Sequence, residues 1–315
     1  MTTIIPVLVL VGMILLSVVR RRWYSQMIQY MDAEDDKSAL KLADRLVRVG
    51  LPDSSKHYNR ALVLMRLNQI DRALQDLKRA VNLASDNTGI RRVYADVLIS
   101  NHQYDEALLQ YNYCINFDPT NPSGYLSRAN LSIRREDAAS AKGDIQTVEA
   151  IVAEGQLKAE KFALYMDGQS RHDYAYSIQG MKALIHMVRL EFESAIAIFD
   201  ALIEHYVKDS WSYSGRGETY FMMGNYEQAL ADFEYAAEIR LESRKRDLLG
   251  RYEHIEPLAG KAIALFKLGQ VDEAKELWQK VLEDEPRAQD LAWLVHQLNW
   301  KLLLHQAAQE LQSYE

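Results

Sequence analysis

Residues 210–243 read SWSYSGRGETYFMMGNYEQALADFEYAAEIRLES, and this stretch decides the fold. Its small residues, such as Gly217 and Ala229, alternate with aromatic residues at the spacing of helical faces. The alanine at 229 also recurs along the chain. It has counterparts spaced 34 residues apart at Ala39, Ala73, Ala107 and Ala141, and further ones at Ala195 and Ala274. Such a period predicts an array of helical repeats.

The period, with small and aromatic residues at fixed offsets, resembles the tetratricopeptide repeat (TPR). When the recurrent alanine is numbered position 20, a second small residue falls at position 8 of every repeat except the first. The first repeat departs most, with Met27 and Ala43 at core positions. The resemblance implies an all-α fold, a right-handed α-solenoid of TPR helical hairpins. The repeats fall at 20–53, 54–87, 88–121, 122–155, 176–209, 210–243 and 255–288.

Segments that do not follow the repeat pattern interrupt the array and flank it at both ends. Residues 156–175 and 244–254 are insertions between repeats, and the second opens with a basic cluster. We assign 1–22 to a membrane anchor, 23–288 to the TPR solenoid and 289–315 to a C-terminal capping helix. That helix, expected from about Asp290 to Leu311, carries more apolar surface than a cap needs. It therefore caps the solenoid, folds back into the groove, or pairs with another chain in self-association.

Residues 3–19 form an uncharged, mostly aliphatic segment, which is followed at once by Arg20, Arg21 and Arg22. This pattern predicts one N-terminal transmembrane helix with a basic stop. A cleaved signal peptide is the alternative, but the segment has neither a basic start nor a small-residue cleavage site. Because the arginines follow the segment, the positive-inside rule predicts a single-pass membrane protein with a cytoplasmic TPR domain.

In TPR proteins, ligands usually lie in the concave groove lined by the first helix of each repeat. The earlier repeats offer a polar lining, which suits hydrogen bonds with an extended peptide. The later repeats offer methionine and aromatic side chains, which adapt to helical partners. The polar positions are Tyr58, Asn59, Arg66, Arg92, Asn130 and Arg134, and the apolar positions are Met181, Leu184, Met187, Trp211, Phe221, Met222, Ile263 and Phe266.

Composition and motifs argue against several other functions. The 37 basic and 44 acidic residues give a formal charge of −7, or −10 without the three anchor arginines, which disfavours nucleic-acid binding. The eight histidines are scattered, and the single cysteine, Cys114, falls at a packed repeat position. We therefore predict no metal site, no cofactor and no enzyme activity. The Lys and Asn pattern with which chaperone-binding TPR proteins hold a C-terminal carboxylate is also absent.

These features together predict a membrane-anchored scaffold or adaptor, of the assembly-factor type, that binds peptide or helical segments of proteins in its groove. The alternative is a permanent structural subunit of a membrane complex, held through its C-terminal helix and the apolar half of the groove. Exchange of partners would favour the adaptor, whereas a complex that survives detergent and salt would favour the subunit.

Overall fold

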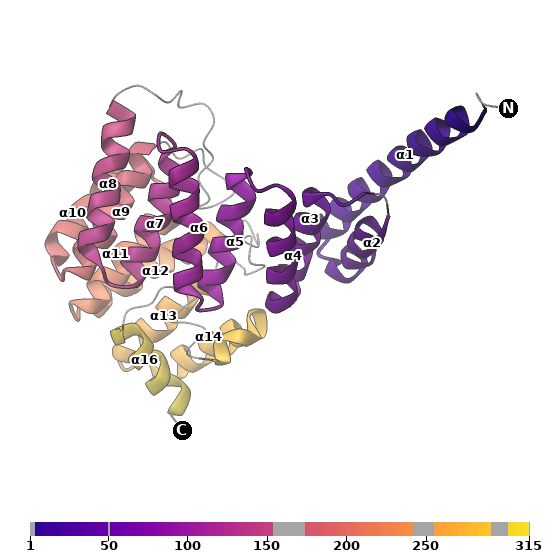
Figure 1. The fold of residues 1–315 in the computed structure, drawn as a ribbon. Helices are drawn as coiled ribbons and strands as arrows, with labels where there is room; N and C mark the ends of the chain where they lie inside the picture. The colour runs from indigo at the N-terminus through magenta and orange to yellow at the C-terminus, as the bar shows by residue number, and fades with distance from the viewer. Residues whose placement is uncertain (1–3, 50, 154–173, 242–254, 291–301, 315) are drawn as a thin grey trace. The chain divides into compact units, whose positions relative to one another are not determined.

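A computed structural model of the chain describes residues 4–49, 51–153, 174–241, 255–290 and 302–314, apart from the side chains of 4–17, 174, 241, 302 and 303. Every regular element in these ranges is helical (Figure 1). The elements are α1 (Ile4–Asp32), α2 (Asp36–Arg48), α3 (Ser54–Arg66), α4 (Ile70–Leu83), α5 (Thr88–Ser100), α6 (Tyr104–Phe117), α7 (Pro122–Arg134), α8 (Ala138–Ala153), α9 (Tyr174–Val188), α10 (Phe192–His205), α11 (Ser210–Met222), α12 (Tyr226–Leu241), α13 (Ile255–Lys267), α14 (Val271–Asp284), η2 (Pro286–Gln289) and α16 (Leu302–Ser313).

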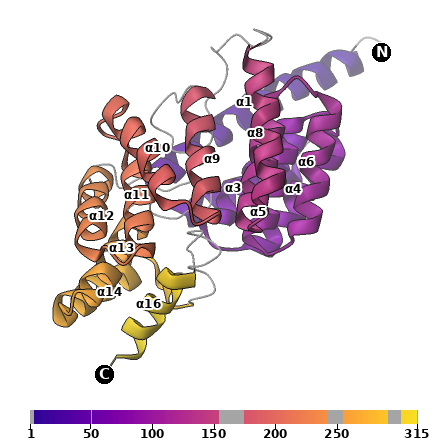
Figure 2. The same cartoon turned by 90° about the vertical axis from the view of Figure 1, so that its left-hand side faces the viewer.

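The prediction of an all-helical, TPR-like solenoid is confirmed for the part of the chain that the structure describes. First and second helices of a repeat pack as hairpins, for example α3 with α4 and α11 with α12. The second helix of one repeat then packs against the first helix of the next, as α10 does against α11. Helix α11 also contacts both α9 and α13, so the first helices form a continuous layer there (Figure 2).

The chain divides into two compact units, and each is described by itself. The N-terminal unit contains α1 to α5 and reaches Asn101, and the C-terminal unit begins at His102 and contains α6 to α16. The border between them falls inside the predicted repeat 88–121. The periodic sequence shows no interruption at this point.

The small residues of the repeat pattern lie where helices of a hairpin approach closely. Every alanine at position 20 is fully buried, and so is every alanine at position 8. Met27, the exception at position 8, is also buried, in a cluster with α2. The fully buried alanines are Ala39, Ala73, Ala107, Ala141, Ala195, Ala229 and Ala274 at position 20, and Ala61, Ala95, Ala129, Ala183 and Ala262 at position 8.

Helix ends follow the same repeat frame. The last residue of a repeat is often Asp or Asn. Its side chain accepts a hydrogen bond from a backbone N–H in the first helix of the next repeat, as Asp53 does for α3 and Asp209 for α11. Within each hairpin the turn places position 15 in the left-handed region. Glycine, which adopts that region without strain, occupies it only at Gly224 and Gly269. The other five turns use Glu34, Asn68, His102, Glu136 and Leu190.

The N-terminal helix combines two predicted segments in one element. Helix α1 runs without a break from Ile4 to Asp32, so the apolar segment and the first TPR helix are continuous. Its 29 residues correspond to a length of about 43 Å. Among the residues that the structure describes, none of the helices combines the length and apolar character needed to span a bilayer. The side chains of 4–17, most of the predicted anchor, lie outside that part.

The helix expected from Asp290 to Leu311 falls partly on the described residues. A short 3-10 helix at Pro286–Gln289 ends at Asp290, whose backbone is extended. Helix α16 then covers Leu302–Ser313. Residues 291–301 lie outside the described part, as do 154–173 and 242–254, which contain nearly all of the two predicted insertions.

Candidate functional site

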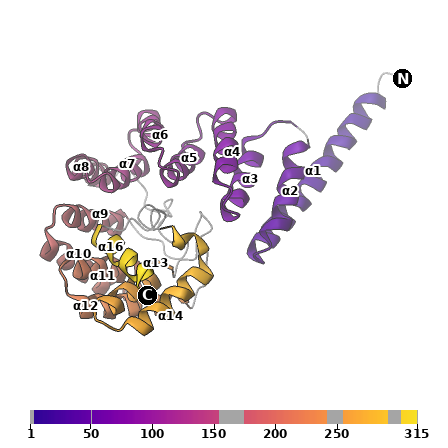
Figure 3. The ribbon, with the colours of Figure 1, turned by 90° about the horizontal axis from the view of Figure 1, so that it is seen from below.

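The first candidate site is the inner face of the last two repeats, and α16 lies on it. Helix α16 contacts the first helices α13 and α11, and Figure 3 shows it inside the arc of α9 to α14. Its buried residues are Leu304, Ala307, Ala308 and Leu311, the i, i+3, i+4, i+7 spacing of an amphipathic helix. They join one apolar cluster with residues of α11 and α13. In this structure α16 therefore lies where a fold-back into the groove would place it.

Polar and aromatic contacts hold the edges of α16 against this face. The Lys267 ammonium at the end of α13 donates to the carboxylate of Glu310. The rings of Phe266 and Tyr314 meet edge to face, with centroids 5.6 Å apart. Nε2 of Gln312 donates to the carbonyl oxygen of Ala288 over 3.3 Å. The face therefore recognises a helix by an apolar stripe in the middle and by charge at the edge.

The predicted apolar groove residues divide into two groups. Met181, Met187, Phe221 and Ile263 are 5%, 1%, 2% and 0% exposed, so they belong to the packed core of the chain. The other four are half-buried: Leu184, Trp211, Met222 and Phe266. A partner could therefore contact the side chains of this second group. It could also contact the face of α11 and α13 that α16 covers in this structure.

The predicted polar groove residues do not form one cluster. Four of them, Tyr58, Asn59, Arg66 and Arg92, lie in the N-terminal unit, and Asn130 and Arg134 lie in the C-terminal unit. All six are half-buried.

Arg66 has a structural role in the N-terminal unit. Its Nε donates to Oδ1 of Asp36 over 2.6 Å, and its Nη2 donates to the carbonyl oxygen of Met31 over 2.8 Å. These bonds connect α3 to the turn between α1 and α2. Asn59 accepts a hydrogen bond from the Tyr24 hydroxyl over 3.4 Å, also from α1.

A set of ion pairs inside the repeats was missed by the sequence analysis. Arg60, Arg128 and Arg216 all stand at position 7, and each guanidinium bonds both oxygens of an aspartate 16 residues later. Each also donates to a residue 16 positions earlier. The later partners are Asp76, Asp144 and Asp232, and the earlier ones are Asp44, Asn112 and Asp200. The recurrent spacing of 16 in the sequence was the available signal.

Burial and hydrogen bonding act differently on two of these aspartates. Burial alone would raise the pKa of Asp76, but hydrogen bonds from Arg60 and His57 outweigh it and hold that pKa below its ordinary value. Burial raises the pKa of Asp232, and the bonds from Arg216 do not compensate for it, while the nearby Asp200 raises it further. These groups connect helices that are neighbours in the solenoid.

The side chains offer no obvious ligand set for a metal. Within the described ranges, no group of three or more His, Cys, Asp or Glu residues is placed to hold an ion. Cys114 is buried.

Comparison with known proteins supports the repeat family. Residues 32–112 match the family model described as anaphase-promoting complex, cyclosome, subunit 3, and residues 260–288 match a tetratricopeptide repeat model. The crystal structure of a tetratricopeptide repeat protein from Parabacteroides merdae is 17% identical, with a TM-score of 0.62 over 92% of this chain and 98% of that one. The APC/C hetero-tetramer Cut9-Hcn1 is 10% identical, with a TM-score of 0.56 over 90% of this chain and 48% of the other.

One curated relative also matches. DnaJ homolog subfamily C member 3 from Gallus gallus is 23% identical over 232 residues, 69% of this chain and 42% of the relative. The match thus spans less than half of that protein's length. The family matches cover residues 32–112 and 260–288, and the helical hairpins observed along the chain have the tetratricopeptide repeat fold. Proteins of this kind mediate protein–protein interactions, and neither family match indicates a catalytic domain.

Proposed function

We propose that this TPR protein is a membrane-anchored scaffold or adaptor, of the assembly-factor type, that binds peptide or helical segments of partner proteins. The observation that supports this best is α16, because an amphipathic helix already packs on the inner face of α11 and α13. Helix-in-groove binding uses the same physics whether the helix comes from the same chain or from a partner.

The chemistry of this face suggests what a partner helix needs. Apolar residues at i, i+3, i+4 and i+7 would match Leu304, Ala307, Ala308 and Leu311, and an acidic residue near the end would match Lys267. Helix α16 has only 12 residues, a length at which an isolated helix is marginal in water. A longer amphipathic helix would bury more apolar area and could replace it.

Site-specific crosslinking in the native membrane tests this proposal. A photoreactive residue at Met222, half-buried on α11, should crosslink to a partner protein, and an excess of a peptide of residues 302–313 should reduce the yield. The matched control is the same probe at Glu227, exposed on the second helix α12. Equal yields at both positions, or a Met222 yield that the peptide does not change, would contradict binding on this face. A partner that stays bound through detergent and salt washing would instead support the permanent structural subunit.

We also propose that residues 3–19 anchor the chain in a membrane, with the repeats on the cytoplasmic side. The support is the uncharged segment, the three arginines that follow it, and the unbroken α1 that contains both. Carbonate extraction should leave the protein in the membrane fraction. Protease added to right-side-out vesicles should spare the repeats, and digestion there would overturn the orientation.

A further inference from the structure

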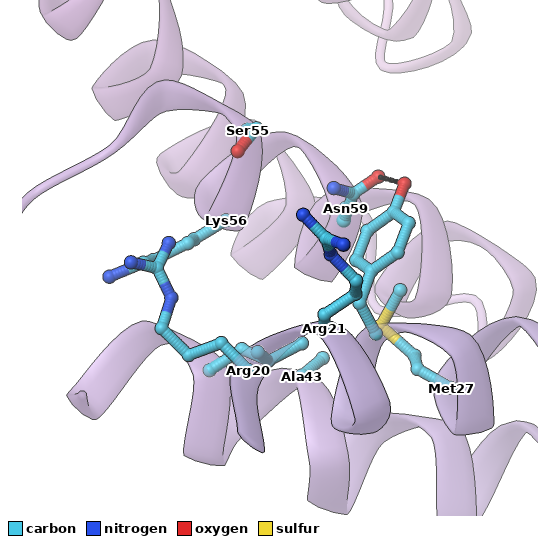
Figure 4. A pocket seen from close by; sticks show the side chains of 9 residues that line it. Arg20, Arg21, Met27, Ala43, Ser55, Lys56 and Asn59 are labelled. Atoms are coloured by element: carbon cyan, nitrogen blue, oxygen red, sulfur yellow. Dashed lines mark hydrogen bonds between the residues drawn. The ribbon is translucent and has the colours of Figure 1, made fainter. Parts of the chain in front are cut away.

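A pocket of about 380 Å³ lies in the N-terminal unit between α1, α2 and α3. Its walls come from Arg20, Arg21, Tyr24 and Met27 of α1, from Ala43 and Leu46 of α2, and from Ser55, Lys56 and Asn59 of α3 (Figure 4). This volume is within the range of small-ligand sites, about 300–1,000 Å³. The floor is apolar, because Met27, Ala43 and Leu46 are buried.

The pocket exists because of a departure from the repeat pattern. In two of the later repeats, a phenylalanine ring at position 24 fills the space against position 6 of the next repeat. A Cβ on Gly215 would lie 2.5 Å from the Phe199 ring, and one on Gly260 would lie 2.6 Å from the Phe233 ring. The corresponding pair in the first repeat is Ala43 with Asn59, and both line the pocket. Ala43 is the smallest residue at position 24 in the chain, where the others are Leu77, Tyr111, Ile145, Phe199, Phe233 and Trp278.

The lining is cationic. Arg20, Arg21 and Lys56 all contribute to it, and none of the described residues that line it is acidic. Arg20 pairs over 3.3 Å with Asp53, which is 38% exposed at the side chain. Arg21 is exposed, and none of the ion pairs among the described residues involves it. The pocket therefore keeps a net positive charge.

Lys56 is a buried cation in this wall, with 6% exposure. Its ammonium donates to two neutral groups, the carbonyl oxygens of Val49 over 2.6 Å and Leu51 over 2.7 Å. An ammonium has three donors, and the described residues accept two of them. Burial lowers the pKa of Lys56 and the neighbouring Arg20 lowers it further, while the carboxylate of Asp53 partly offsets these two effects. A bound anion would oppose both effects.

Polar donors complete the lining. The oxygen of the Asn59 amide accepts the Tyr24 hydroxyl, and Figure 4 shows the amide nitrogen on the side away from Tyr24. Two arginines, a lysine and an amide suit a phosphate group, to which guanidinium groups donate in bidentate fashion and an ammonium adds charge.

The position along α1 indicates the source of that phosphate. Arg20 and Arg21 come directly after the apolar segment 3–19, and Tyr24 lies one helical turn further. At 1.5 Å per residue these side chains start within about 8 Å of the end of the segment, comparable to the headgroup region on one side of a bilayer. If the segment spans the membrane, the pocket is level with lipid phosphates.

We propose that this pocket binds the phosphate of an anionic phospholipid headgroup, so that the first repeat is docked against the membrane surface. The inference rests on the proposed anchoring of residues 3–19. A specific lipid contact of this kind would fix the orientation of the N-terminal unit on the bilayer, which a flexibly attached anchor would not do.

Lipid binding by the full-length protein in neutral detergent micelles tests the proposal. Native mass spectrometry would follow binding of phosphatidylglycerol, with phosphatidylcholine and inorganic phosphate as parallel arms. We expect phosphatidylglycerol to be preferred. Arg21→Gln should weaken its binding roughly tenfold, as expected for loss of one charge-assisted hydrogen bond. Arg22→Gln is the matched control, since Arg22 is the next residue, exposed, and absent from the lining.

A second variant tests the cavity itself. Ala43→Leu places in the first repeat the residue found at Leu77 in the second, and should fill the floor, keep the helical content and abolish lipid binding. Equal losses in Arg21→Gln and Arg22→Gln, or unchanged binding in Ala43→Leu, would overturn the pocket. Tight binding of inorganic phosphate that displaces the lipid would overturn the lipid as its ligand. Because micelle binding does not require insertion, carbonate extraction reports on the anchor separately.

Discussion

The N-terminal and C-terminal units use the same repeat frame with different side-chain chemistry. Arginine–aspartate pairs connect helices in both units, as Arg60 with Asp76 in the N-terminal unit and Arg216 with Asp232 in the C-terminal unit, and the N-terminal unit also has Arg66 with Asp36. In the C-terminal unit, aromatic rings pack against glycines, as Phe199 does on Gly215 and Phe233 on Gly260. A repeat thus fixes where helices meet but not how the contact is made. A small side chain, Ala43, leaves a pocket in the N-terminal unit, and apolar side chains of α11 and α13 form the face that accepts α16 in the C-terminal unit.

The largest effect should come from removing a ring of the C-terminal unit. Phe233 is fully buried against Gly217 and Gly260, so Phe233→Ala should lower the free energy of unfolding by about 3–5 kcal/mol. Urea denaturation followed by circular dichroism would measure this loss, and hydrogen exchange should locate it in α11 to α16. Tyr235→Ala, on the exposed side of the same helix, is the control and should cost far less. Equal costs for both would mean that the ring is not a core element.

A smaller effect is expected from the charged contacts of the N-terminal unit. Arg66→Met leaves the buried carboxylate of Asp36 and the carbonyl oxygen of Met31 without this donor, and should cost about 2–3 kcal/mol. Arg48→Met, an exposed arginine at the end of α2, should change stability little. Adding Asp36→Asn to Arg66→Met should recover part of the loss. If Arg66→Met instead reduced partner binding at unchanged stability, Arg66 would be a groove residue as the sequence predicted.

The smallest effect is the pH dependence of stability. The contribution of one buried aspartate should change with pH in opposite directions in the two units. The pKa of Asp76 is lowered on folding, so its stabilisation is present above the unfolded value, about 3.9, and is lost as pH falls through the folded one. The pKa of Asp232 is raised, so its contribution is present below about 3.9 and is lost as pH rises through the folded pKa. The cost of Asp76→Asn should therefore shrink on acidification, and that of Asp232→Asn should grow. Unfolding free energies at several pH values would measure both slopes, and slopes of the same sign would remove this contrast.

Much of the fold was predictable because it is repeated locally. The alanines at positions 8 and 20 are buried because helices of a hairpin cross there, and both helices lie within one period. The same frame identified groove positions such as Asn59 and Met222. It did not identify which of them are core, since the burial of Phe221 and Ile263 depends on neighbouring repeats and on α16.

The candidate sites were less predictable for a related reason. The departure at Ala43 was visible in the sequence, but it indicated only a weak repeat. That Ala43 leaves a cationic pocket became visible only in the structure, where Lys56 lies beside it. The Lys56 ammonium is held there by the carbonyl oxygens of Val49 and Leu51. The contacts of Arg66 were likewise not visible in the sequence, because its guanidinium connects α3 to the turn that follows α1.

The sequence by itself determined the 34-residue frame, the all-helical hairpins and the apolar segment that precedes them, because each depends on residues close together along the chain. Only the tertiary structure decided that α16 lies on α11 and α13, where Lys267 meets Glu310 across 43 residues. It also decided that Ala43 opens a cationic pocket beside Arg21. Such contacts join distant parts of the chain, and the buried area and charge that select them are properties of the folded state.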